Sequence, residues 1–135
     1  MKLATKFFLA ATVFALCGMV WGILMSASHD YLLAPAHGHL NLLGFVAMGI
    51  WGAYYALTPP AAASNLGRTH FALSVLSVVA VVPGIVQVLL GQGELLAQIG
   101  SIALVANMLL FGVIVLRFGA GAHAPNDHLT AQPAE

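Results

Sequence analysis

Three of the six histidines in this chain of 135 residues lie in one short stretch, residues 29–39. His29, His37 and His39 share that stretch with Asp30. Neutral imidazole is a good ligand for zinc, copper and heme iron, and a carboxylate can bind a metal itself or orient a histidine that does. The stretch therefore predicts a metal site formed by His29, Asp30, His37 and His39.

The spacing of His37 and His39 is compatible with two geometries, which depend on where the next helix begins. If that helix begins at Pro35, residues two apart point about 200° away from each other and cannot chelate one ion together. If it begins near Leu40, both histidines lie in a loop and can share an ion. The sequence leaves both geometries open.

Small and amide side chains accompany this stretch at helical spacing. Asn41 follows His37 by four residues and so lies on the same helical face, where it can orient the imidazole of a heme or metal ligand. Gly44 continues that face and permits the close approach of a neighbouring helix or a flat ligand. Gly18 and Gly22 form a second small-residue face, which predicts close packing within the bundle or between protomers.

The remaining histidines are separate from the cluster. His70 is on the order of 25 Å from His39 in depth if both lie on membrane helices, because each helical residue rises about 1.5 Å. One monomer therefore cannot place both on the same iron, and we expect His70 to form a structural hydrogen bond with Tyr54 or Tyr55. His123 and His128 fall in a polar C-terminal stretch, where we expect them to be solvated.

The elements that must position these residues are membrane helices. The chain is 61% hydrophobic and only 6% charged, whereas a soluble domain carries about 25% charged residues. Four stretches reach the roughly 20 apolar residues that a bilayer crossing needs: about residues 7–25, 40–57, 71–90 and 95–116. Short connections predict an all-α, integral membrane four-helix bundle with up-down-up-down topology over residues 1–117.

The few charges predict an orientation in the lipid bilayer. The basic residues Lys2, Lys6, Arg68 and Arg117 all fall on one side of such a bundle, and the positive-inside rule makes that side cytoplasmic. Both termini are then cytoplasmic, which in a bacterial cell places the protein in the inner membrane. Residues 118–135 are rich in small and polar residues and predict a flexible cytoplasmic tail.

Polar residues within the apolar stretches are expected to face the bundle interior, where they can hydrogen-bond across helices. Three uncharged ones qualify: Gln87, Gln98 and Asn107. The net charge of zero argues against nucleic acid, which proteins bind through clustered Lys and Arg that neutralise phosphates. No nucleic-acid partner is therefore expected.

Part of the sequence resembles a known family. The run His37-Gly38-His39-Leu40-Asn41-Leu42-Leu43-Gly44-Phe45, continued by Gly52-Ala53-Tyr54-Tyr55, resembles a segment of heme–copper oxidase subunit I. It is similar also to short four-helix bacterial membrane proteins described as cytochrome-c-oxidase-like, in which a later helix opens with His-Phe, as His70-Phe71 does here. The resemblance implies that His37, His39 and His70 carry any heme or metal function.

These observations favour a heme- or metal-binding membrane protein that acts in electron transfer or sensing. The expected cofactor is heme b, with copper or zinc as the alternative. For heme, one axial ligand is expected to be His37 or His39 and the other His29 or a histidine of a second protomer. The chain has too few histidines for a low-spin heme and a heme–copper centre together, so we do not expect a complete oxidase. The alternatives are a non-catalytic accessory subunit of a larger respiratory-type membrane complex and a copper- or zinc-handling membrane protein.

Overall fold

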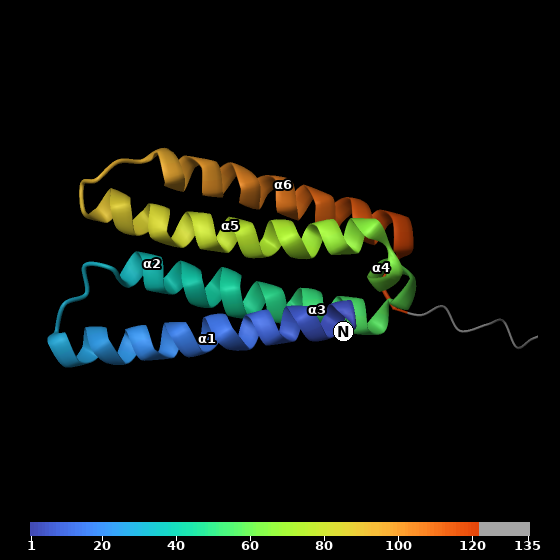
Figure 1. Ribbon diagram of the computed structural model, residues 1–135, viewed down its shortest axis with the longest axis horizontal. Coiled ribbons are helices and arrows are strands. Elements are labelled where there is room, and N and C mark those ends of the chain that lie inside the picture. The colour runs from blue at the N-terminus through green and yellow to red at the C-terminus, as the bar shows by residue number, and fades with distance from the viewer. Residues whose placement is uncertain (122–135) are drawn as a thin grey trace, which may run out of the picture.

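The computed structural model describes residues 1–121, and within that range the chain is helical apart from short connections (Figure 1). Four helical segments are long and apolar enough to cross a membrane. The elements in chain order are α1 (Leu3–Ser28), α2 (Ala34–His39), η1 (Leu40–Ala47), α3 (Met48–Leu57), α4 (Pro59–Ala63), α5 (Asn65–Leu89) and α6 (Leu95–Phe118). The prediction of an all-α integral membrane bundle is confirmed.

The long segments form two antiparallel hairpins that lie side by side (Figure 1). The first pairs α1 with the continuous segment 34–57, which consists of α2, η1 and α3, and the second pairs α5 with α6. Connections 29–33 and 90–94 lie at one end of the bundle, called the hairpin end here. The N-terminus of α1, the short helix α4 and the end of α6 lie at the other, called the terminal end (Figure 1).

The helices extend beyond the predicted apolar stretches because local signals, and not hydropathy, end them. His29 ends α1 in the left-handed conformation, with φ 56°. Ser64 caps α5 by accepting a hydrogen bond from the backbone N–H of Gly67 at 3.0 Å, which satisfies an otherwise unpaired donor of the first turn. The third crossing therefore begins at Asn65 and not at Phe71.

The second crossing begins at Ala34, with Pro35 in its first turn, where the missing N–H of proline has no cost. Its middle part, Leu40–Ala47, is wound as a π-helix, a widened geometry that is rare and frequently found at functional sites. The sequence analysis did not predict it. Within this region the Asn41 side chain donates to the backbone carbonyl of His37 at 3.0 Å, and such a side chain competes with the backbone for that carbonyl.

Two glycines permit direct backbone contact between α5 and α6. A Cβ atom on Gly84 would lie 2.6 Å from Cα of Ala97, and one on Gly100 would lie 2.7 Å from Cα of Val81. Both distances are too short for any side chain, so these backbones approach directly. Asn107 lies buried in this interface, as predicted.

One prediction needs correction. Gln98 is exposed and lies beside Glu94, with its Nε2 atom 3.5 Å from the carboxylate, so it does not face the interior. Gln98 is on the first turn of α6, next to the connection 90–94 and not in the middle of a crossing. Gln87 is half-buried.

The first residues after the predicted bundle, 118–121, are within the described range. Phe118 still belongs to α6, and the following residues are attached to the bundle. The Tyr54 hydroxyl donates to the carbonyl of Gly119 at 2.8 Å, and the backbone N–H of Gly121 donates to the Thr58 hydroxyl at 3.0 Å. The rest of the predicted tail, with His123 and His128, lies outside the described residues.

Candidate functional site

A groove opens beside His37 near the hairpin end. It has a volume of about 450 Å³ and is called the hairpin-end groove here. His37 and Asn41 contribute its polar groups, and both are half-buried. Its lining consists of Gly18, Met19, Gly22, Ile23, Ser26, His37 and Asn41.

Two glycines of α1 make room for the polar pair. A Cβ atom on Gly22 would lie 3.2 Å from Cε1 of His37, and one on Gly18 would lie 2.9 Å from Cγ of Asn41. The small-residue face predicted on the first helix therefore packs within the bundle, against His37 and Asn41. Any larger residue at Gly18 would occupy the space of the amide.

The Asn41 amide faces the imidazole of His37. Its nitrogen lies 3.4 Å from Nδ1 and 3.2 Å from Nε2, so it approaches the ring as a whole and not one nitrogen alone. Trp21 stands edge-on to the same ring, with 6.1 Å between ring centroids. An amide carries both a donor and an acceptor, so Asn41 is suited to orient the His37 imidazole, as its i,i+4 spacing predicted.

His39 does not join this pair. Because the helix begins at Ala34, His37 and His39 are both helical and point about 200° apart. His39 is exposed, and its Nδ1 lies 2.7 Å from the carbonyl oxygen of Pro35, one turn earlier. Of the two geometries left open by the sequence, the structure has the one in which these histidines cannot chelate one ion together.

His29 and Asp30 lie in the exposed connection that follows α1. The Asp30 carboxylate accepts a hydrogen bond from the backbone N–H of Leu32 at 3.0 Å and so stabilises the turn. Within residues 1–121, no three His, Cys, Asp or Glu side chains are grouped closely enough to hold a metal ion. The structure thus brings His37 and Asn41 together, places His39 on another side of the helix and leaves His29 and Asp30 in the exposed connection.

The environment of His70 near the terminal end is different. Its side chain is completely buried, and the Tyr55 hydroxyl lies 3.0 Å from its Nδ1 atom. The predicted structural hydrogen bond with a tyrosine of the second crossing is confirmed, with Tyr55 as the partner.

Aromatic rings enclose this histidine. Phe111 stacks on the imidazole at a centroid distance of 5.3 Å, and Trp51 stands edge-on at 4.8 Å. Phe7 of α1 lies 5.5 Å away. These rings, from α1, α3 and α6, occupy the space around His70 that a flat cofactor would need.

A second polar group lies one turn further along α5. The buried Ser74 hydroxyl is 2.6 Å from the carbonyl oxygen of His70 and 3.1 Å from Oδ1 of Asn107. His70 Nε2 and Asn107 Nδ2 have no hydrogen-bond partner among the described residues. The sequence analysis did not single out Ser74, although its i,i+4 spacing from His70 was the available signal.

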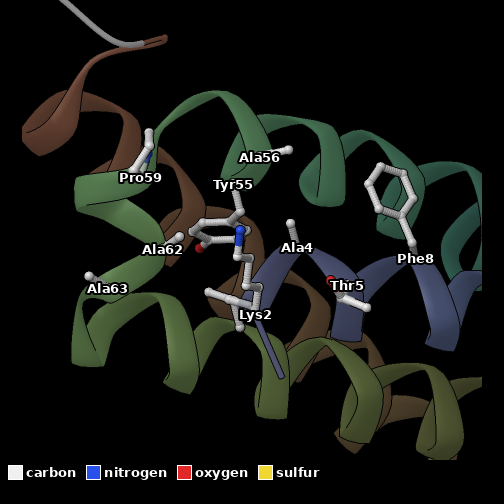
Figure 2. Close-up of a pocket in the computed structure, with 10 residues that line it drawn as sticks. Lys2, Ala4, Thr5, Phe8, Tyr55, Ala56, Pro59, Ala62 and Ala63 are labelled. Carbon is white, nitrogen blue, oxygen red and sulfur yellow. The ribbon is translucent and has the colours of Figure 1, made fainter.

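The largest cavity described lies at the terminal end, between α1, α3 and α4, and is called the terminal-end pocket here (Figure 2). It has a volume of about 570 Å³. Its lining consists of Lys2, Leu3, Ala4, Thr5, Phe8, Tyr55, Ala56, Pro59, Ala62 and Ala63. The sequence analysis did not predict this cavity because α4, which closes one side of it, is a single short turn after Thr58.

Comparison with known proteins gave no relative. No protein-family model, curated protein sequence or solved structure matches the chain.

Proposed function

We propose that this integral membrane protein binds heme b in the hairpin-end groove, with His37 as an axial ligand to the iron. The observation that supports this assignment best is the half-buried imidazole of His37 beside two glycines, with the amide of Asn41 against it. An amide that orients the imidazole raises the affinity of a metal site, and the groove that His37 lines gives a flat macrocycle access to this side chain.

The hairpin-end groove beside His37 is better suited to hold a heme than the space around His70 is. His37 borders an open space, whereas His70 is enclosed by Phe7, Trp51 and Phe111. A heme at His70 would require these rings to move and would cost the core contacts that they make. His37 is therefore the ligand in this proposal.

The second axial ligand comes from another copy of the chain. Gly22 is the residue of α1 that faces His37, and His29 lies seven residues beyond it. His29 ends α1 in the left-handed conformation and is exposed in the connection that follows, whereas the imidazole of His37 is half-buried against α1. A homodimer that presents two His37 side chains to one heme satisfies the coordination.

A bound heme supplies one-electron chemistry, since its iron changes between the ferric and ferrous states. The chain's own contribution is to hold and orient the ligand through Asn41 and to keep the site at the membrane. We propose that the terminal end faces the cytoplasm of a bacterial cell, because Lys2, Lys6, Arg68 and Arg117 belong to that end. Electron transfer or sensing at the opposite face is the role that follows.

The second candidate function is a non-catalytic accessory subunit of a larger respiratory-type membrane complex. The observation that favours it is the absence, within residues 1–121, of any group of three metal-ligating side chains. A copper- or zinc-handling protein is the third candidate, and its site would need ligands from more than one copy of the described chain.

A visible absorption spectrum of detergent-purified protein tests the proposal. We expect a Soret band in the wild type and one heme per two chains by heme extraction. His37→Ala should lose the band, and His37→Gly should regain it when free imidazole is supplied. His39→Ala is the matched control, since it removes an equivalent side chain two residues away on the other face of the helix and should retain the heme.

Three outcomes would count against this assignment. Loss of heme in His70→Ala with retention in His37→Ala moves the site to the terminal end. Purified wild type with neither heme nor metal favours the accessory subunit. For the orientation, a reporter fused after Glu135 should be active only if it folds in the cytoplasm, and alkaline phosphatase activity there would reverse it.

A further inference from the structure

The terminal-end pocket combines an apolar floor with a single cation at its rim (Figure 2). Of its lining residues, Leu3 and Tyr55 are buried, and Ala4 and Ala62 are half-buried. Lys2, which precedes α1, and Thr5 of α1 are the exposed polar residues of the lining. Its volume of about 570 Å³ lies within the roughly 300–1,000 Å³ of sites that bind small molecules.

The charges around the pocket have one sign. The basic side chains of Lys2, Lys6, Arg68 and Arg117 all lie on elements at this end of the bundle. The acidic residues of the described chain, Asp30 and Glu94, both lie at the hairpin end. No described carboxylate is thus available to neutralise Lys2, and the pocket favours an anion.

We propose that the terminal-end pocket binds one anionic phospholipid, with the phosphate at Lys2 and an acyl chain along the apolar floor. A membrane protein is surrounded by molecules that carry both features, and basic pockets between membrane helices recognise anionic headgroups. The proposal is independent of heme binding, because this pocket and the hairpin-end groove share no residue.

The bound lipid is expected to stabilise the terminal end. The ring of Tyr55 forms part of the floor, and its hydroxyl pairs with His70 inside the aromatic enclosure. An acyl chain would cover the pocket side of this ring. Any ligand that binds only the folded state raises its stability, so an anionic lipid should raise the melting temperature of the purified protein.

Native mass spectrometry of delipidated protein in detergent tests the headgroup. With added phosphatidylglycerol, the wild type should retain one molecule that phosphatidylcholine does not replace. Lys2→Gln should weaken this retention about five-fold, the effect of about one lysine near an anionic lipid. Lys6→Gln is the matched control, since Lys6 lies one turn further along α1 and does not line the pocket.

Two tryptophan variants on α3 test the acyl-chain contact. Ala56 is exposed and lines the pocket, so Ala56→Trp should fill it and abolish retention of the lipid. Ala53 is also exposed, three residues earlier, and lines none of the described cavities. Ala53→Trp should therefore retain the lipid.

Three results would overturn the proposal of a phospholipid site. Equal losses in Lys2→Gln and Lys6→Gln would mean that the whole basic surface attracts lipid without a site. Equal retention of phosphatidylglycerol and phosphatidylcholine would exclude recognition of the anionic headgroup. Displacement of the lipid by soluble glycerol phosphate would mean that the headgroup alone is bound and the acyl chain is not.

Discussion

The two ends of the bundle hold histidines of the same chemistry in opposite environments. His37 is half-buried beside a groove and faces the amide of Asn41, whereas His70 is fully buried and pairs with Tyr55 inside a shell of aromatic rings. The residues around each imidazole decide the difference. A groove borders His37, whereas the rings of Phe7, Trp51 and Phe111 surround His70. In this protein, His37 is therefore the better candidate for binding a cofactor, because its neighbours leave room for a cofactor and those of His70 do not.

The largest effect is expected from filling the space beside Asn41. Gly18→Leu should lower the free energy of unfolding by about 3 kcal/mol, the upper end of the usual cost of overpacking, because a Cβ at this position already meets the amide. Thermal unfolding in detergent measures this loss, and membrane insertion should be unchanged because leucine favours insertion.

Gly49→Leu is the matched control for Gly18→Leu. A Cβ at Gly49 meets no atom within 4 Å, so this variant should unfold like the wild type. If Gly18→Leu is equally stable, the first helix does not pack against Asn41 as described.

A smaller effect is expected from removing the amide that orients His37. Asn41→Ala should retain the hairpin-end site but weaken heme binding about 10–100-fold, the usual cost of losing a partner that orients a metal ligand. Titration of the purified apoprotein with heme measures this change. Unchanged affinity would mean that Asn41 serves packing against Gly18 alone.

At the terminal end, Tyr55→Phe should lower stability by about 0.6–1.7 kcal/mol, the range measured for hydrogen bonds between membrane helices. The heme content should not change, because the Tyr55–His70 pair lies apart from the hairpin-end groove.

A double-mutant cycle isolates this interaction. The double variant Tyr55→Phe/His70→Phe should be less destabilised than the sum of the two single variants, because no polar group of the pair is then left unpaired. Strict additivity of the two changes would show that the hydrogen bond does not contribute.

The smallest effect is expected at His39. His39→Ala should change stability by no more than about 0.5 kcal/mol, the usual range for exposed positions, since its hydrogen-bond partner is a backbone carbonyl of its own helix. Thermal unfolding and the absorption spectrum together check this result. Loss of heme in this variant would place the site on the other face of the helix.

The sequence by itself determined the membrane bundle and much of its local pairing. Long apolar stretches can satisfy their backbone hydrogen bonds in lipid only as helices, so the four crossings follow from hydropathy. Helical periodicity also predicted that Asn41 shares a face with His37, and the difference in depth separated His70 from the cluster. Each of these inferences depends only on the geometry of a single helix, that is, on its periodicity and its rise per residue.

Only the tertiary structure decided which histidine has space around it. The start of the second crossing at Ala34 separates His37 from His39, and the packing of α1 places Gly18 and Gly22 against His37 and Asn41. The enclosure of His70 requires rings from three elements, and the terminal-end pocket requires the short helix α4. Contacts between distant segments depend on how helices rotate and pack against one another, which the hydropathy of each helix does not specify.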